Sequence, residues 1–143
     1  MTFRPCIKSA ALALALTLVV NSVTAEVVAV VSSTSTITSL SNAQVTDIFL
    51  GKVSRFPNGT LAVPIDQVEG SPARDEFYAK FANKSPAQVK AHWTKIIFTG
   101  RGQPPKSVPN SVEVRKLIAA NPQAISYIER SAVDSTIKVV VQP

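Results

Sequence analysis

The sequence contains very little of the two residue types that most often hold metals or form covalent links. Cys6 is its only cysteine and His92 its only histidine. Cys6 precedes the apolar segment of the N-terminus, whereas the cysteine of a lipoprotein attachment site follows such a segment. Cys6 is therefore not a lipid attachment site, and we expect it to be removed together with the apolar segment. The remaining chain then has no cysteine for a disulfide, a thiol nucleophile or a thiolate metal site. With a single histidine as well, we expect no metal site and no cofactor.

Long apolar runs are also absent, except for one near the N-terminus. Arg4 and Lys8 precede an apolar stretch from residue 10 to residue 20, and small residues follow it up to Ala25. This arrangement is typical of a secretory signal peptide, so we expect residues 1–25 to be cleaved and residues 26–143 to act in the periplasm. The apolar run is about half of the roughly 20 residues that span a bilayer, so we expect no stable membrane insertion after cleavage.

The charged residues form no long run of one sign. The chain has 15 lysines and arginines against 9 aspartates and glutamates, a formal net charge of +6. Its basic residues are scattered, whereas nucleic-acid surfaces cluster them, so we expect no nucleic-acid partner. A modest positive balance is compatible with attraction of small anions and equally with an ordinary solvated surface.

Segments typical of strands and helices alternate along the rest of the chain. Two capping boxes, Ser41 with Gln44 and Ser85 with Gln88, mark helix starts. Strands interleaved with helices indicate one α/β domain with a largely parallel sheet. Ligands of such sheets bind at the carboxyl ends of the strands, which here indicates the loops after Val31, Ile65 and Phe98. The sequence predicts strands over 26–31, 61–65, 124–129 and 136–141, helices over 40–51, from Ser71, from Ser85 and from Asn110 or Ser111, and a loop over 99–109.

Apolar residues at helical spacing predict which helix faces are buried. The third helix carries the most extended stripe, and His92 on it is expected to pack beside Trp93 rather than to act as a base or metal ligand. The predicted inward residues are Val45, Ile48 and Phe49, then Phe77 and Phe81, then Val89, His92, Trp93, Ile96 and Ile97, and finally Val114, Leu117 and Ile118.

The start of the helix at Ser71 is the most informative local feature. Ser71 is a favoured N-cap residue, Pro72 suits the first helical position, and Gly70 lets the backbone approach a ligand closely. Backbone N–H groups without a helical partner and the positive dipole end together favour an anion there. The sequence therefore indicates a candidate oxyanion site, with an ordinary capped helix as the alternative.

Five motifs follow one another along the chain: LSNAQVTDIFLGK at 40–52, EGS at 69–71, Trp93, GRG at 100–102 and AISYIE at 124–129. In this order they resemble one lobe of the periplasmic phosphate-binding proteins of ABC transporters. The chain looks most like small, signal-bearing members of that superfamily. The resemblance implies a single three-layer α/β/α lobe with a largely parallel central sheet, and it implies phosphate as the ligand.

The sequence also departs from the larger relatives of that superfamily. Their helix start reads Arg-x-Asp-Gly-Ser-Gly-Thr, and their phosphate lies between two lobes. The 118 residues from Glu26 onward are too few for two such lobes. Gly70 and Ser71 are kept, whereas Gln67, Glu69, Pro72 and Ala73 replace the arginine, aspartate, second glycine and threonine.

The candidate ligand groups come from three segments. The Ser71 hydroxyl beside Gly70 can donate a hydrogen bond, and Arg74 or Arg101 can supply a bidentate guanidinium. Glu69 can accept the proton of a monohydrogen phosphate. Each side chain has a structural alternative: an exposed ion pair for Glu69, pairing with Tyr78 or an acid for Arg74, and a simple turn for Arg101. Ser33 and Thr34 are further hydroxyl candidates, with a solvated loop as their alternative.

These features predict a secreted single-lobe binding protein for a small oxyanion, most simply phosphate, linked to phosphate uptake or sensing. The alternative is an envelope protein–protein interaction module that has lost ligand binding. In either case an envelope protein or a second copy could close the open side of the lobe. No Gly-x-Ser-x-Gly motif or acid–base pair is present, so we expect no catalytic residues and no enzyme activity.

Overall fold

Five strands form one mixed sheet at the centre of the protein. The structure is a computed structural model that describes residues 26–141. The predicted signal peptide, residues 1–25, lies outside the described residues. The strands follow the order β3-β2-β4-β1-β5 across the sheet. They are β1 (Val27–Ser32), β2 (Val63–Gln67), β3 (Lys106–Val108), β4 (Ala124–Glu129) and β5 (Ile137–Val141).

Strand β1 alone runs against the direction of the other four. Strand β2 pairs in parallel with β3 and β4, while β1 pairs antiparallel with both β4 and β5. The carboxyl ends of β2, β3 and β4 therefore meet at one edge of the sheet, and the carboxyl end of β1 lies at the opposite edge. The prediction of a largely parallel central sheet is confirmed.

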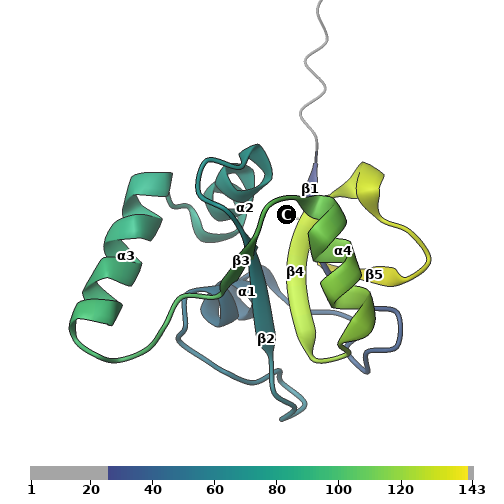
Figure 1. Cartoon of the computed structure of the whole chain (residues 1–143). Helices are drawn as coiled ribbons and strands as arrows, with labels where there is room; N and C mark the ends of the chain where they lie inside the picture. Colours follow the sequence, from purple (N-terminus) through teal and green to yellow (C-terminus); the bar gives the residue numbers. More distant parts are fainter. Residues whose placement is uncertain (1–25, 142–143) are drawn as a thin grey trace, which may run out of the picture.

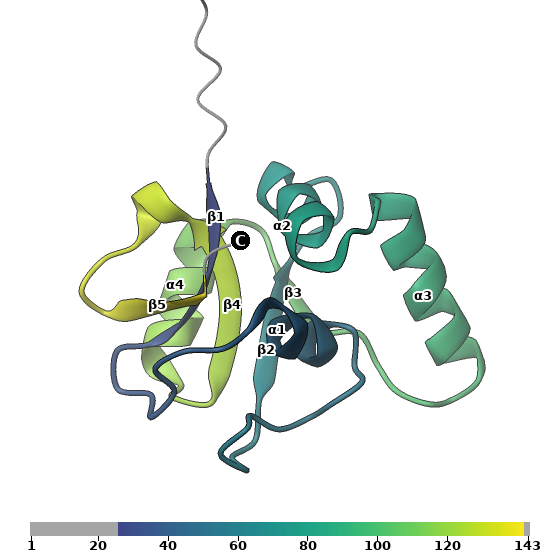
Figure 2. The ribbon, with the colours of Figure 1, turned by 180° about the vertical axis from the view of Figure 1, so that it is seen from behind.

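Helices cover both faces of this sheet, which gives the expected three-layer α/β/α arrangement. Helix α4 lies on one face in Figure 1, and α1 and α2 lie on the other, as Figure 2 shows. Helix α3 stands to the side of α2 in both views. The helices are α1 (Asn42–Phe49), α2 (Pro72–Ala82), α3 (Pro86–Phe98) and α4 (Ser111–Ala120), and a short 3-10 turn (Arg130–Ala132) follows β4.

The predicted helix caps are present. Ser71 caps α2, Asn110 caps α4, and both predicted capping boxes form, at the start of α1 and of α3. These caps satisfy backbone N–H groups that have no partner within the helix, so the chain itself fixes where each helix begins.

Strand β1 separates two apolar layers. Its residues alternate between the layers because successive side chains of a strand point to opposite faces. Val27, Ala29 and Val31 join the cluster formed with α1, α2 and α3, and the alternate valines join the cluster beneath α4. In the first cluster Phe77 stacks on Tyr127 with ring centroids 4.0 Å apart.

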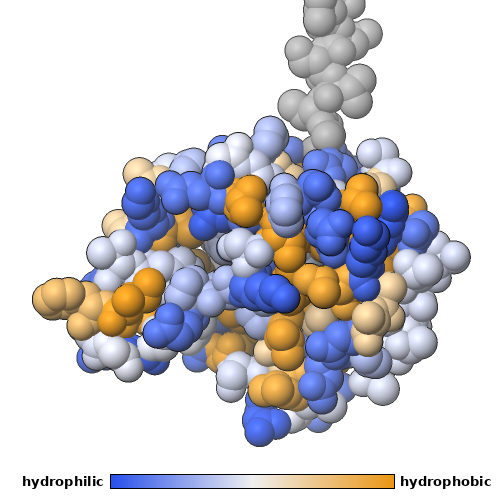
Figure 3. Space-filling view, viewed as in Figure 1, coloured by the Kyte–Doolittle hydropathy of each residue, from blue (hydrophilic) through white to orange (hydrophobic). Residues whose placement is uncertain are grey.

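Two predictions about the segment around α3 are wrong. Residues 99–109 are not entirely a loop, because Lys106–Val108 pair with β2 as β3. Ile97, predicted to be buried, is 48% exposed, and the neighbouring Phe98 is 91% exposed. Helix α3 ends beyond the body of the protein, and apolar side chains gather over its outer end in Figure 3.

Within residues 26–141, no helix combines the length and apolar character that crossing a membrane requires.

Candidate functional site

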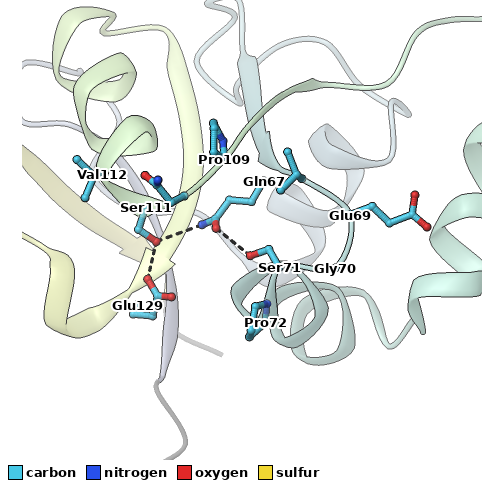
Figure 4. A pocket seen from close by; sticks show the side chains of 11 residues that line it. Gln67, Glu69, Gly70, Ser71, Pro72, Pro109, Ser111, Val112 and Glu129 are labelled. Atoms are coloured by element: carbon cyan, nitrogen blue, oxygen red, sulfur yellow. Dashed lines mark hydrogen bonds between the residues drawn. The ribbon is translucent and has the colours of Figure 1, made fainter.

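A pocket opens at the edge where β2, β3 and β4 end. Gln67 ends β2, Pro109 follows β3, and Glu129 ends β4, so three parallel strands contribute to it. The starts of α2 and α4 lie on either side (Figure 4). This is the position at which parallel α/β sheets bind ligands. The residues that line the pocket are Gln67, Val68, Glu69, Gly70, Ser71, Pro72, Pro109, Asn110, Ser111, Val112 and Glu129.

Ser71 has two hydrogen-bonding roles at the start of α2. Its hydroxyl oxygen accepts the backbone N–H of Arg74 at 3.5 Å, and its hydroxyl donates to Gln67 Oε1 at 2.9 Å. Gly70 has a φ of 90°, a left-handed conformation that favours glycine. No other atom lies within 4 Å of where a Cβ of Gly70 would be, so the backbone there is open to the pocket.

Gln67 joins the two helix starts. Besides accepting from Ser71, its side-chain amide donates to Ser111 Oγ and to the backbone oxygen of Tyr127, both at 3.3 Å. Gln67 is 2% exposed. Its amide holds the starts of α2 and α4 together.

The start of α4 contributes a second set of donors. Asn110 caps it by accepting the backbone N–H of Glu113 at 3.0 Å, which leaves the earlier N–H groups without helical partners. Ser111 donates its hydroxyl to Glu129 Oε2 at 2.5 Å, so a carboxylate lies against this helix start. The sequence did not indicate this half of the pocket, because β3 is too short to be recognised as a strand and its carboxyl end was therefore not counted.

A buried carboxylate supports the α2 side of the pocket from below. Asp66, only 3% exposed, accepts the hydroxyl of Tyr78 at 2.7 Å, the hydroxyl of Tyr127 and the backbone N–H of Gln67 at 2.8 Å. Burial, reinforced by the adjacent Asp66 charge, raises the pKa of Tyr78 and of Tyr127 far above the ordinary tyrosine value. The neutral tyrosines and the carboxylate thus fix the end of β2.

Arg74 belongs to this buried group rather than to the pocket. Its Nε lies 3.5 Å from Asp66 Oδ1, and its guanidinium carbon lies 5.2 Å from the centre of the Tyr78 ring. The predicted alternative, pairing with Tyr78 or an acid, is the arrangement found. The side chain of Arg74 is largely buried.

Glu69 is exposed at the rim and points away from the centre of the pocket (Figure 4). Its carboxylate lies 3.6 Å from Lys90 Nζ, the kind of exposed ion pair that the sequence left open as an alternative. Arg101 does not line this pocket. It lines a different one, beside His92 and Trp93.

Ser33 and Thr34 lie at the opposite edge of the sheet. Val31, just before them, pairs with Ile125 at the beginning of β4, whereas Glu129 at its end pairs with Val27. The expectation that the loop after Val31 shares an edge with the start of α2 is therefore wrong, since β1 runs antiparallel. The sequence did not reveal this, because a run of valines has the same pattern whether the strand pairs in parallel or antiparallel.

Metal-binding groups of three or more histidine, cysteine or acidic residues are not found within residues 26–141.

Comparison with known proteins identifies the fold. No protein-family model matches the sequence, and no curated protein does. A solved structure from Clostridium perfringens, described as a phosphate ABC transporter substrate-binding protein with bound phosphate, matches with a TM-score of 0.64 at 21% identity. The chain shares its fold. The match covers 80% of this chain and 44% of that one.

Two further structures agree with this match. An ABC-type phosphate transport receptor from Vibrio cholerae gives a TM-score of 0.63 at 17% identity, covering 80% of this chain and 45% of the receptor. PstS from Borrelia burgdorferi gives 0.60 at 13% identity, covering 80% and 46%. The chain thus spans less than half the length of these proteins, and the resemblance predicted from its motifs is confirmed at the level of the fold.

Proposed function

We propose that the chain is a periplasmic binding protein for a small oxyanion, with phosphate as its ligand, and that it serves phosphate uptake or sensing. The observation that supports this most is the convergence of the starts of α2 and α4 on one pocket. Each start presents a positive dipole end, which stabilises an anion without any catalytic group. The start of α4 offers the backbone N–H groups of Ser111 and Val112, whereas at the start of α2 Pro72 has no N–H and the N–H groups of Ser71 and Arg74 already have acceptors. The shared fold with phosphate receptors supports the same ligand.

The charges of the pocket favour an oxyanion that carries a proton. Glu129 and Glu69 line it, and no lysine or arginine does. A fully deprotonated anion would be repelled by the Glu129 carboxylate, whereas a protonated phosphate can donate a hydrogen bond to it. Glu129 thus takes the role that the sequence suggested for Glu69. Sulfate has no proton to donate at neutral pH and is expected to bind more weakly.

The affinity of the isolated chain is expected to be low. The ligand has to compete with Gln67 for the Ser71 hydroxyl, which is already hydrogen-bonded. Solvent also competes for the hydrogen bonds of the ligand at the open side of the pocket. In addition, the free-energy cost of ordering the ligand is offset by only a few contacts.

Calorimetric titration of residues 26–143 with phosphate and with sulfate tests the proposal. Replacing Ser71→Ala removes a hydroxyl donor to the anion and should weaken phosphate binding about tenfold or more. Ser85→Ala is the matched control, because it removes an N-cap of the same type from α3, outside the pocket. Glu129→Gln should reduce the preference for phosphate over sulfate by about tenfold. An unchanged phosphate dissociation constant in Ser71→Ala would refute the site.

A second candidate function is supported by different observations. The polar side chains of the pocket already hydrogen-bond to one another, as an interaction module without a ligand would require. These bonds join Ser71 to Gln67, Gln67 to Ser111, and Ser111 to Glu129. The exposed Phe98 at the end of α3 could contact an envelope protein or a second copy. Site-specific photo-crosslinking from position 98 in intact cells distinguishes the two functions: capture of one partner together with no heat of phosphate binding would favour the module.

A further inference from the structure

A second pocket, unrelated to the first, lies between the end of α1 and the outer half of α3. It has a volume of about 500 Å³. It shares no lining residue with the pocket between α2 and α4. Three segments form it: Leu50 to Lys52 after α1, one side of α3 including His92 and Trp93, and the turn from Arg101 to Gln103.

The indole of Trp93 forms the apolar floor of this pocket. Trp93 is 7% exposed, and a Cβ built on Gly51 would lie 2.8 Å from its Cη2 atom, so only a glycine allows this approach. His92 meets the indole edge-on at 5.3 Å and is held by a 2.8 Å hydrogen bond between its Nε2 and the backbone oxygen of Leu50. The floor is therefore built from fixed side chains.

Trp93 also carries an unsatisfied donor. Its Nε1 is buried and has no hydrogen-bond partner among residues 26–141. Buried indole N–H groups are ordinarily hydrogen-bonded, because leaving one without a partner costs about 1–3 kcal/mol. A ligand acceptor that reached this N–H would relieve this cost.

The charges around the pocket are all positive. Lys52, Lys95 and Arg101 line it, and no aspartate or glutamate does. Lys52 has a distant ion pair with Asp47 at 3.9 Å, and within residues 26–141 neither Lys95 nor Arg101 forms any ion pair. Cations at helix C-termini complement the helix dipole. That explanation accounts for the charges but not for the hollow that they surround or for the floor of Trp93.

We propose that this pocket binds a small organic anion in which one anionic group is attached to a flat apolar body. The guanidinium of Arg101 and the ammonium of Lys95 meet the anionic group, and Trp93 and Ile96 contact the apolar body. Inorganic phosphate lacks the apolar body and binds here only weakly. The site is independent of the proposed phosphate site, so either can fail alone.

Trp93 is the only tryptophan of the chain, so its fluorescence reports on this pocket and on the neighbouring hollow that it also lines, and not on the pocket between α2 and α4. Phenyl phosphate serves as the probe, phenol as the neutral form of the same ring, and inorganic phosphate as the anion without a ring. We expect a saturable fluorescence change with phenyl phosphate, at concentrations about tenfold or more below those at which phenol or inorganic phosphate act. A response to phenol equal to that of phenyl phosphate, or no saturable response, overturns the proposal.

Variants identify the charges responsible. Lys95→Gln combined with Arg101→Gln should weaken phenyl phosphate binding about tenfold or more, since both charge-assisted contacts are lost. Lys80→Gln combined with Lys116→Gln removes the same charge from exposed ion pairs elsewhere and should leave binding unchanged. Ser71→Ala should also leave it unchanged. Equal binding by the two double variants, with thermal unfolding showing both folded, rejects the assignment.

Discussion

Both tyrosines of the chain donate their hydroxyls to the same buried carboxylate. Tyr78 and Tyr127 are the only tyrosines, and each donates to Asp66. Burial, together with the nearby negative charge, raises the pKa of both phenols. An unfolded tyrosine titrates near pH 10, so above that pH the unfolded chain loses protons that the folded chain keeps. Stability that is fully present below about pH 10 is therefore lost as the pH rises further.

We expect the free energy of unfolding to fall above about pH 10, with a limiting slope of roughly 2.7 kcal/mol per pH unit for two phenols. Urea denaturation across this range measures the slope, and ultraviolet absorbance measures tyrosinate directly. Tyr127→Phe should be less stable at neutral pH by about 1–3 kcal/mol and should show about half the slope. Tyrosinate absorbance that titrates near pH 10 while the protein remains folded would contradict the prediction.

Single residues were predictable from the sequence where their partners are close in the chain. Ser71 as an N-cap needs only residues two or three positions ahead, and it was identified. The partners of Gln67 lie at Ser111 and Tyr127, 44 and 60 positions away, and no local pattern reveals such contacts. Glu129 was missed as a pocket residue for the same reason, whereas Glu69 was chosen because it lies only two positions before Ser71.

At the scale of elements, the end of α1 is joined to α3 by the close approach of Gly51 to Trp93 and by the hydrogen bond between Leu50 and His92. Gly51 ends the helix with a φ of 74°, and its missing side chain makes room for Trp93. Gly59 has a similar φ of 87° in a turn with open space around it. The two glycines therefore share the same backbone requirement and differ only in the contact with the indole.

Gly51→Ala is expected to destabilise the protein by about 2–5 kcal/mol, combining the left-handed strain of about 1–2 kcal/mol with overpacking of about 1–3 kcal/mol. Gly59→Ala carries only the strain and should cost about 1–2 kcal/mol. Urea denaturation of both variants isolates the contribution of the contact. Equal losses of stability in Gly51→Ala and Gly59→Ala would contradict the prediction, because they would show that α3 moves away from α1 at no cost in free energy.

Elements with strong local signals were predicted well, and those defined by their neighbours were not. Capping boxes and apolar stripes located α1, α2, α3 and α4 to within a few residues. Strand β3 has three residues and exists because it pairs with β2, so no periodicity marks it. The antiparallel direction of β1 is likewise a property of the sheet, and it removed Ser33 and Thr34 from the edge where α2 begins.

At the scale of the whole molecule, the pocket between α2 and α4 is open to solvent on one side. The match covers 44% and 45% of two of the solved structures, so more than half of each has no counterpart in this chain. A ligand held from one side is weakly bound, because solvent competes for each hydrogen bond. A protein surface that covers the pocket would remove this competition, whether it comes from a second copy or from an envelope protein.

Linkage makes that idea measurable. If a covering surface strengthens phosphate binding by some factor, phosphate must strengthen the association by the same factor. We expect sedimentation equilibrium of the chain, or of its mixture with a crosslinked partner, to show tighter association in millimolar phosphate than without it. Ser71→Ala should abolish this dependence while leaving association without phosphate unchanged, since the hydroxyl faces the pocket and its partner Gln67. Equal association constants for the wild-type chain and Ser71→Ala, with and without phosphate, would show that association does not depend on phosphate binding. The interaction module would then remain as the function of this surface.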